Sequence, residues 1–313
     1  MKKVVLGIVI VMAAGIIAAV VAGLKFYGPG FGIYISKPSP EKYVQQSVTF
    51  MDNGIYADTD EWEKKKAEVL EAAKTVESFE DAYPIIEDAV KVAGGKHSQL
   101  WKPDRVKEEN ESYTAPECSI KDGVITVKLP AFNGDRGDEY MNTVLDFLRN
   151  NKDAKGVIID LRGNRGGDMG PMAGAVSPLL PDGDLMFFNI RGGEQPVYLE
   201  EGKLYGSGTG ADIKDPFKMK NIKVAVLTDE NTASSAEATL ICFLGLDYVK
   251  TFGKPTAGYA SSNVVFKLYD KAQLLVTVGR DVDRNGNVYC EDPIKPDVET
   301  DDPVKEAVKW INN

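Results

Sequence analysis

Hydrophobic and polar positions beyond about residue 113 alternate between two patterns. Residues 156–161 and 224–227 are almost continuously apolar, which is typical of strands that a parallel sheet buries on both faces. Residues 138–150 instead place their apolar positions on one side, as an amphipathic helix does. Further strands are expected at 124–129, 248–252, 264–268 and 274–278, with helices at 170–180, 238–244 and 303–311. This alternation predicts an α/β core domain over residues 111–313.

The residues before this core predict helices alone. Three helices are expected at about 40–50, 58–75 and 78–95, and capping patterns open the second and the third of them. Residues 26–39 are rich in glycine and proline and predict a linker. The chain is therefore expected to carry an N-terminal helical cap domain over residues 40–110.

The first 25 residues depart from a soluble pattern. Lys2 and Lys3 precede twenty residues without a charge, Val4–Gly23. At ~1.5 Å per residue such a helix spans about 30 Å, the thickness of the hydrocarbon core of a bilayer. This predicts a transmembrane anchor over residues 1–25, with the lysines inside the cytoplasm and the remaining chain outside. A cleaved signal peptide, which would release a secreted protein, is the alternative, because residues 20–22 fit a cleavage site.

Composition narrows the range of partners. Of the 313 residues, 43% are hydrophobic and 27% charged, as in an ordinary globular protein, and the formal net charge is −10. That charge argues against nucleic-acid partners, which require basic patches. A single histidine and the lack of a Cys-x-x-Cys pair argue against a zinc site, and no cofactor is expected. A bridge between Cys118 and Cys290 stays open, as does the oligomeric state.

The hexapeptide Thr232–Glu237, Thr-Ala-Ser-Ser-Ala-Glu, lies between an expected strand and an expected helix. At such a turn a serine hydroxyl can face a cleft beside unpaired helix N–H groups, as a nucleophile requires. Ser-x-x-Glu before an apolar run is also a capping box, which needs only hydrogen bonds at the helix end. The hexapeptide alone favours the cap, and the motifs elsewhere in the chain favour a nucleophile.

A glycine-rich turn, Asp160–Gly167, follows the first buried strand. Glycine permits positive φ and close approach of the backbone to a ligand, and α/β folds build their sites at the carboxyl ends of strands. The turn lacks the spacing of a phosphate-binding loop. Its consecutive N–H groups suit an oxyanion hole, and a plain strand-to-helix turn is the alternative.

Four motifs in order carry a family resemblance. They are Asp160-Leu-Arg with Gly166-Gly167, Leu227-Thr with Thr232–Glu237, Gly253-Lys-Pro-Thr-Ala-Gly258, and Ile294-Lys-Pro-Asp297. Over roughly residues 90–300 the chain resembles the tail-specific (C-terminal-processing) serine peptidases, and most of all their tricorn-core-like branch. The resemblance implies a crotonase/ClpP-like α/β core with Ser234 as the nucleophile. It also implies an oxyanion hole built from the N–H groups of Ser235 and of Gly166 or Gly167.

The resemblance also concerns the catalytic base. Tail-specific peptidases carry a lysine after the third motif, where this chain has Tyr259. The tricorn-like branch uses a histidine, and His97 matches its position. A pKa near neutrality suits histidine to proton transfer from serine to a leaving amine. Glu291 matches that branch's glutamate before the fourth motif. Whether Lys254 or Ser98 takes part in the reaction stays open.

Residues 281–292 also nearly match a calcium loop, with Asp281, Asp283, Asn285 and Gly286 at EF-hand spacing. The flanking residues predict strands rather than helices, and Asn-Gly is a strong signal for a hairpin turn. We therefore expect a hairpin here and no metal.

The preferred hypothesis is a membrane-anchored, extracytoplasmic serine endopeptidase that hydrolyses protein or peptide substrates. Ser234 would attack, His97 would take its proton, and Glu291 would position or polarise the site. The interval from His97 to the strand at 124 leaves no room for the PDZ domain of many relatives, so the cleft or the helical cap would select substrates. A non-catalytic surface module that binds peptide or glycan, and an acyl-CoA enzyme of the crotonase type, are the alternatives.

Overall fold

The computed structural model describes residues 20–25 and 27–313 of the chain. The chain folds into two compact units. Among the described residues, the helical unit comprises those up to Val106 and Asn263–Thr277, and the sheet unit comprises Lys107–Ser262 and Val278–Asn313. Residues 1–19 of the anchor predicted at residues 1–25 lie outside the described residues. Within the described ranges, no helix combines the length and the apolar character that crossing a membrane requires.

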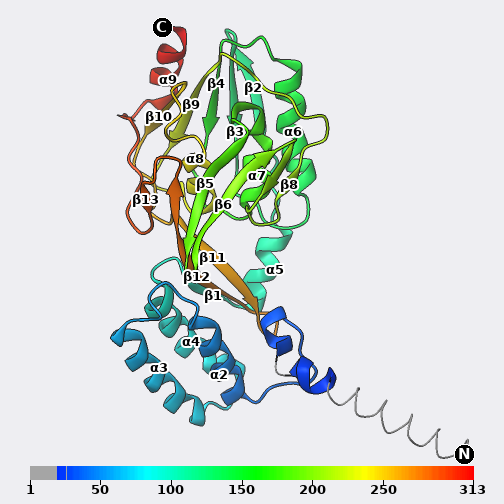
Figure 1. The fold of residues 1–313 in the computed structure, drawn as a ribbon, viewed down its shortest axis with the longest axis vertical. Helices are drawn as coiled ribbons and strands as arrows, with labels where there is room; N and C mark the ends of the chain where they lie inside the picture. The colour runs from blue at the N-terminus through cyan, green and yellow to red at the C-terminus, as the bar shows by residue number, and fades with distance from the viewer. Residues whose placement is uncertain (1–19, 26) are drawn as a thin grey trace, which may run out of the picture. The chain divides into compact units, whose positions relative to one another are not determined.

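In the helical unit the short helix η1 (Gly28–Phe31) is followed by α2 (Pro40–Met51), α3 (Asp60–Ala72), η2 (Ala73–Thr75) and α4 (Phe79–Gly94) (Figure 1). The three predicted helices are thus confirmed within a few residues. Ser39, Thr59 and Ser78 cap them, and each side-chain oxygen accepts the N–H three residues on. Their apolar faces bury a core that includes Tyr43, Trp62 and Ile86.

After α4, strand β1 (Gln99–Trp101) pairs with the first residues of β12 (Gln273–Asp283). Strand β11 (Ser261–Lys267) also pairs with β12. Both β11 and β12 run along the chain from one unit into the other, as does α5 (Pro103–Glu111). Neither β1 nor α5 was predicted, because three residues and a strongly charged nine-residue segment carry little periodic signal.

The main sheet of the sheet unit has six strands in the order β14-β10-β9-β4-β3-β2. They are β2 (Glu117–Lys121), β3 (Val124–Lys128), β4 (Gly156–Asp160), β9 (Lys223–Thr228), β10 (Val249–Gly253) and β14 (Val298–Glu299). All neighbours are parallel except β2 and β3. The helices are α6 (Gly137–Asn150), α7 (Met169–Ala175), η3 (Ser177–Leu179), α8 (Ser235–Ile241) and α9 (Pro303–Asn312). The predicted α/β architecture is confirmed.

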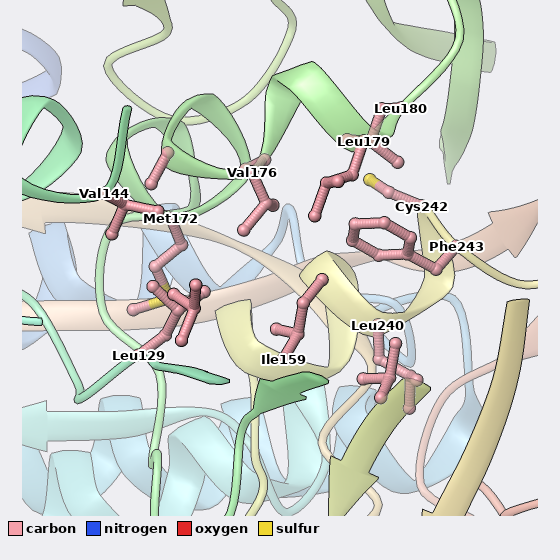
Figure 2. Close-up of a cluster of buried hydrophobic side chains, with 14 of the residues drawn as sticks. Leu129, Val144, Ile159, Met172, Val176, Leu179, Leu180, Leu240, Cys242 and Phe243 are labelled. Carbon is pink, nitrogen blue, oxygen red and sulfur yellow. The ribbon is translucent and has the colours of Figure 1, made fainter. Parts of the chain in front are cut away.

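Alternate residues of the central strands point to opposite faces of this sheet. Ile158 and Leu227 pack against α9, whereas Val157 and Ile159 join a larger cluster with residues of α6, α7 and α8. Figure 2 shows part of that larger cluster, with Ile159 below Met172 of α7 and Val176, the residue that follows α7. Burial on both faces explains why these strands are apolar throughout in the sequence.

An antiparallel sheet forms the rest of the sheet unit. The end of β12 pairs with β5 (Gly183–Ile190), which continues to β6 (Gly193–Glu200), β7 (Lys203–Tyr205) and β8 (Ala211–Asp212). Strand β13 (Val288–Tyr289) also pairs with β12. The predicted hairpin around Asn285-Gly286 is confirmed, because Asp283 Oδ1 accepts the N–H groups of Asn285 and Asn287 within that turn.

Candidate active site

Two turns meet at the carboxyl edge of the parallel sheet. Strands β4 and β9 are neighbours, and Asp160 lies opposite Leu227 at their ends. The chain therefore emerges from both strands at the same edge, where α/β folds place their sites. The two turns are joined by hydrogen bonds from the N–H of Ala233 to the carbonyl of Asn164, 2.9 Å, and from the Thr232 hydroxyl to the carbonyl of Leu161, 3.0 Å.

Ser234 has an unusual backbone conformation at the start of α8. Its φ is 56° and its ψ is −123°, whereas a non-glycine residue with positive φ is uncommon and costs about 1–3 kcal/mol. A sharp, strained turn from strand to helix is the arrangement that exposes a serine nucleophile in other hydrolases. Ser234 itself is only half-buried. This backbone conformation makes Ser234 the candidate nucleophile of the site.

Gly166 packs directly on Ser234. With φ of 101°, an added Cβ would lie 2.7 Å from Ser234 Cβ and 3.0 Å from the carbonyl oxygen of Ala233. No side chain fits in that space, so the close approach of the two turns requires glycine. The N–H of Gly166 donates to Asn164 Oδ1 at 2.9 Å and is therefore already used.

The N–H groups of Gly167 and Ser235 remain as candidate oxyanion donors. Gly167 is exposed, and its N–H donates no hydrogen bond to any of the described residues. Ser235 is the first residue of α8, so its N–H has no partner within the helix. The Ser235 hydroxyl donates to the carbonyl of Gly167 at 2.5 Å and holds the two residues together.

Two buried side chains that the sequence did not assign to the site support these turns. Asn164 is fully buried and donates to the carbonyl of Leu129 at 2.9 Å while accepting from Gly166. Glu237 is fully buried too and accepts the N–H of Ser234 at 2.9 Å. Its place in a Ser-x-x-Glu box was the available signal. Its contacts with the third motif could not be foreseen from that box.

The third and fourth motifs also meet in the sheet unit. The N–H of Thr256 donates to the carbonyl of Ile294 at 3.0 Å, and the N–H of Ile294 donates back to Thr256 Oγ1 at 2.8 Å. Gly258 lies against the backbone of Glu291, where an added Cβ would be 2.6 Å from the carbonyl oxygen. Glu291 is therefore carried on a segment that is fixed to the turn after β10.

Burial and charge shift the pKa values of two carboxyl groups here. Burial raises the pKa of Glu237, and the hydrogen bonds that it accepts oppose the rise. Burial, and then the charge of Glu237, raise the pKa of Asp281 well above its ordinary value. Asp281 is 1% exposed, and its Oδ1 has no hydrogen-bond partner within residues 20–25 and 27–313.

His97 belongs to the helical unit and lies in the turn between α4 and β1. It is buried. The next residue, Ser98, holds the turn, because its hydroxyl donates to Thr277 Oγ1 at 3.0 Å and accepts the N–H of Thr277 at 2.9 Å. These bonds give Ser98 a structural role, which is to fix the turn to Thr277. A meeting of His97 with Ser234 stays a prediction.

Lys254 is poorly suited to act as the base. Its Nζ lies 2.6 Å from Asp301 Oδ1, and the hydrogen bond to this carboxylate raises the pKa of Lys254. A lysine that holds its proton more firmly accepts one from serine less readily. In the described part of the chain, no group of three or more His, Cys, Asp and Glu side chains could hold a metal ion, and no disulfide joins the cysteines.

A family comparison agrees with the motifs. The sequence model of Peptidase family S41 matches residues 123–300. The chain belongs to peptidase family S41. It is therefore a serine peptidase, and the resemblance to C-terminal-processing peptidases is confirmed.

Individual relatives extend the likeness to the whole chain. Nisin-resistance protein from Lactococcus lactis subsp. lactis is 37% identical over 319 residues, which cover 100% of this chain and 98% of that protein. The structure of a lipoprotein from Streptococcus agalactiae superposes with a TM-score of 0.80 at 29% identity, covering 90% of this chain and 98% of that one. The photosystem II D1 C-terminal processing protease shares the fold, with a TM-score of 0.56 at 14% identity over 85% of this chain and 94% of its own.

Proposed function

We propose that this S41 peptidase acts through Ser234, with His97 as its base and Glu291 as a polarising group. The observation that carries the proposal is the conformation of Ser234, φ 56° and ψ −123°, packed against Gly166. A plain helix cap has no need of that strain. The N–H groups of Gly167 and Ser235 are the proposed oxyanion donors. The N–H of Gly166 is not included, because it already donates to Asn164 Oδ1.

The proposed reaction proceeds in two stages. Ser234 Oγ forms a bond to the scissile carbonyl carbon while its proton passes to His97, and the oxyanion of the tetrahedral intermediate accepts from the two N–H groups. His97 then donates that proton to the departing amine, which leaves an acyl-enzyme. A water molecule then attacks the ester carbonyl while its proton passes to His97. The bond from the carbonyl carbon to Ser234 Oγ breaks, Ser234 takes the proton back from His97, and the carboxylic acid product leaves. Each oxyanion donor is expected to contribute about 10²–10³ in rate.

We further propose that the peptidase, with a crotonase/ClpP-like core, works outside the cytoplasm, anchored through residues 1–25, on peptides that resemble nisin. The uncharged stretch Val4–Gly23 after two lysines supports the anchor. The names of two relatives, a nisin-resistance protein and a lipoprotein, support a surface location and a peptide substrate. Nisin is therefore the first peptide to test.

The nucleophile can be tested with a fluorophosphonate probe on the purified full chain in detergent. We expect a single adduct on Ser234 by peptide mass spectrometry, and none in Ser234→Ala. The same pair of proteins is then incubated with nisin, and products are sought by mass spectrometry. An intact, folded wild-type protein that carries no adduct on Ser234 would contradict the proposal. Cleavage of other peptides but not of nisin would contradict only the substrate.

A further inference from the structure

Glu237 accepts hydrogen bonds from the start of α8 and also from a second turn, Thr256–Tyr259. Its oxygen Oε2 accepts the N–H of Ser234 at 2.9 Å and the N–H of Tyr259 at 2.7 Å. Its other oxygen, Oε1, accepts the hydroxyl of Thr256 and, at 2.9 Å, the N–H of Gly258. A capping box accounts for the first of these four bonds and for none of the others.

The four donors fit an ionised carboxylate. Three of them are backbone N–H groups, which cannot accept, and the oxygen of Thr256 already accepts the N–H of Ile294 at 2.8 Å. Both oxygens of Glu237 accept backbone N–H groups, and hydrogen bonds of this kind favour the ionised carboxylate. A buried charge normally needs a cation or several donors. Here the donors of two separate turns serve that purpose.

The same carboxylate connects the nucleophile to the third and fourth motifs. Ser234 and Tyr259 share one acceptor atom, so the turn Thr256–Tyr259 is held at a set position relative to Ser234. Thr256 in turn pairs with Ile294, and Gly258 lies against the backbone of Glu291. The contacts thus lead from the start of α8 to the segment that carries Glu291, without a break.

We propose that Glu237 is a positioning residue of the peptidase, which sets Ser234 and the Thr256–Tyr259 turn in one fixed arrangement. The proposal rests on Ser234 as the nucleophile. Loss of the Ser234 N–H bond removes a support of its strained conformation, and a displacement of about 1 Å in a reacting group can cost 10²-fold in rate. The effect should appear in the rate of bond formation at Ser234 and not in probe binding.

The test is the saturation kinetics of fluorophosphonate labelling in four full-length proteins: wild type, Glu237→Ala, Glu237→Gln and Asp283→Asn. We expect the maximal labelling rate to fall about 100-fold in Glu237→Ala. In Glu237→Gln the remaining oxygen can still accept from Ser234 and Tyr259, so the fall should be nearer tenfold. The half-saturating probe concentration should change less than threefold in both.

Asp283→Asn is the matched control. Asp283 is 1% exposed, and its two oxygens also accept four hydrogen bonds, from Asn285, Asn287 and Tyr289 in the β12–β13 turn. Its loss should lower the melting temperature and leave the maximal labelling rate within threefold of the wild type.

The outcomes separate the two proposals. Wild-type protein without an adduct on Ser234 would refute the nucleophile and the inference with it. A labelled wild type beside a folded Glu237→Ala variant that reacts at an equal rate would refute the positioning role alone. If Glu237→Ala does not fold, Glu237→Gln decides: an unchanged maximal rate refutes the role, and a fall that Asp283→Asn does not share supports it.

Discussion

In both units a Ser or Thr stands directly before a helix, but its backbone conformation and its role differ between them. In the helical unit Ser39, Thr59 and Ser78 have extended backbone, with ψ of 157°, 152° and 168°, and each side chain accepts a helix N–H. In the sheet unit Ser234 stands at the same position of α8 with φ of 56° and ψ of −123°. Ser234 and Glu237 also form a capping box, so the backbone conformation of Ser234, and not its place before the helix, sets it apart from the other three.

The difference lies in what surrounds each serine. The three caps need only their own helix, because the acceptor and donor are three residues apart. Ser234 is held by Gly166 from a turn about 70 residues earlier in the chain and by Glu237, which also binds the turn after β10. Strain at one residue persists only where its surroundings over-determine the conformation, and such residues gather at functional sites.

The largest effect that separates the two kinds of helix start is expected from Ser234→Ala. Loss of a nucleophile lowers peptide hydrolysis by roughly 10⁴-fold or more, whereas the fold persists. The measurement is the rate of nisin cleavage beside the free energy of unfolding in urea. A variant that keeps more than a tenth of the wild-type rate would return Ser234 to the class of simple caps.

Gly166→Ala should come next. A Cβ at this position would meet Ser234 Cβ at 2.7 Å, and φ of 101° disfavours any side chain. We expect the labelling rate of Ser234 to fall about 100-fold, with a loss of roughly 1–3 kcal/mol in stability. Gly163→Ala is the control, because Gly163 also has positive φ, 76°, yet an added Cβ there meets no atom within 4 Å. Equal loss of labelling in both variants would show backbone strain alone to be the cause.

Asp281→Asn tests how the sheet unit tolerates a buried carboxyl whose Oδ1 has no hydrogen-bond partner in the described part of the chain. Burial raises the pKa of Asp281, so the folded state keeps a proton that the unfolded chain releases above about pH 4. Stability must then fall as pH rises, by about 1.4 kcal/mol per pH unit, until the folded group also ionises. Asparagine removes that dependence.

The free energy of unfolding of Asp281→Asn, compared with that of the wild type at the same pH, should therefore increase as the pH rises. The measurement is urea unfolding between pH 4 and 7. Parallel curves for the wild type and the variant would show that Asp281 is ionised in the folded protein.

The smallest effect is expected from Ser78→Ala in the helical unit. Its hydroxyl accepts the N–H of Asp81 at 3.1 Å, and loss of such a cap costs about 1 kcal/mol. Labelling of Ser234 should stay at the wild-type rate. A large loss of labelling with an unchanged melting temperature would mean that this cap, too, serves the reaction.

Regular elements could be predicted well where the pattern is local. The apolar runs of β4 and β9 and the capped helices α2–α4 were found within a few residues, because periodicity and capping act over one or two turns. The register of the long hairpin of β5 and β6 could not be predicted from the sequence. Its pairing joins residues such as Gly183 and Leu199, and no local pattern encodes that register.

The sequence by itself determined the α/β class and the family, and it led to the proposal of Ser234 as the nucleophile, because four ordered motifs and a strand–turn–helix pattern are properties of the chain alone. Only the tertiary structure decided three features. Ser234 has positive φ, the N–H of Gly166 donates to Asn164, and Glu237 accepts hydrogen bonds from four donors. These features depend on turns that are distant in sequence and that meet only when parallel strands end at a common edge. Hydrogen bonds between such turns form in the folded chain, where burial makes each unsatisfied donor costly.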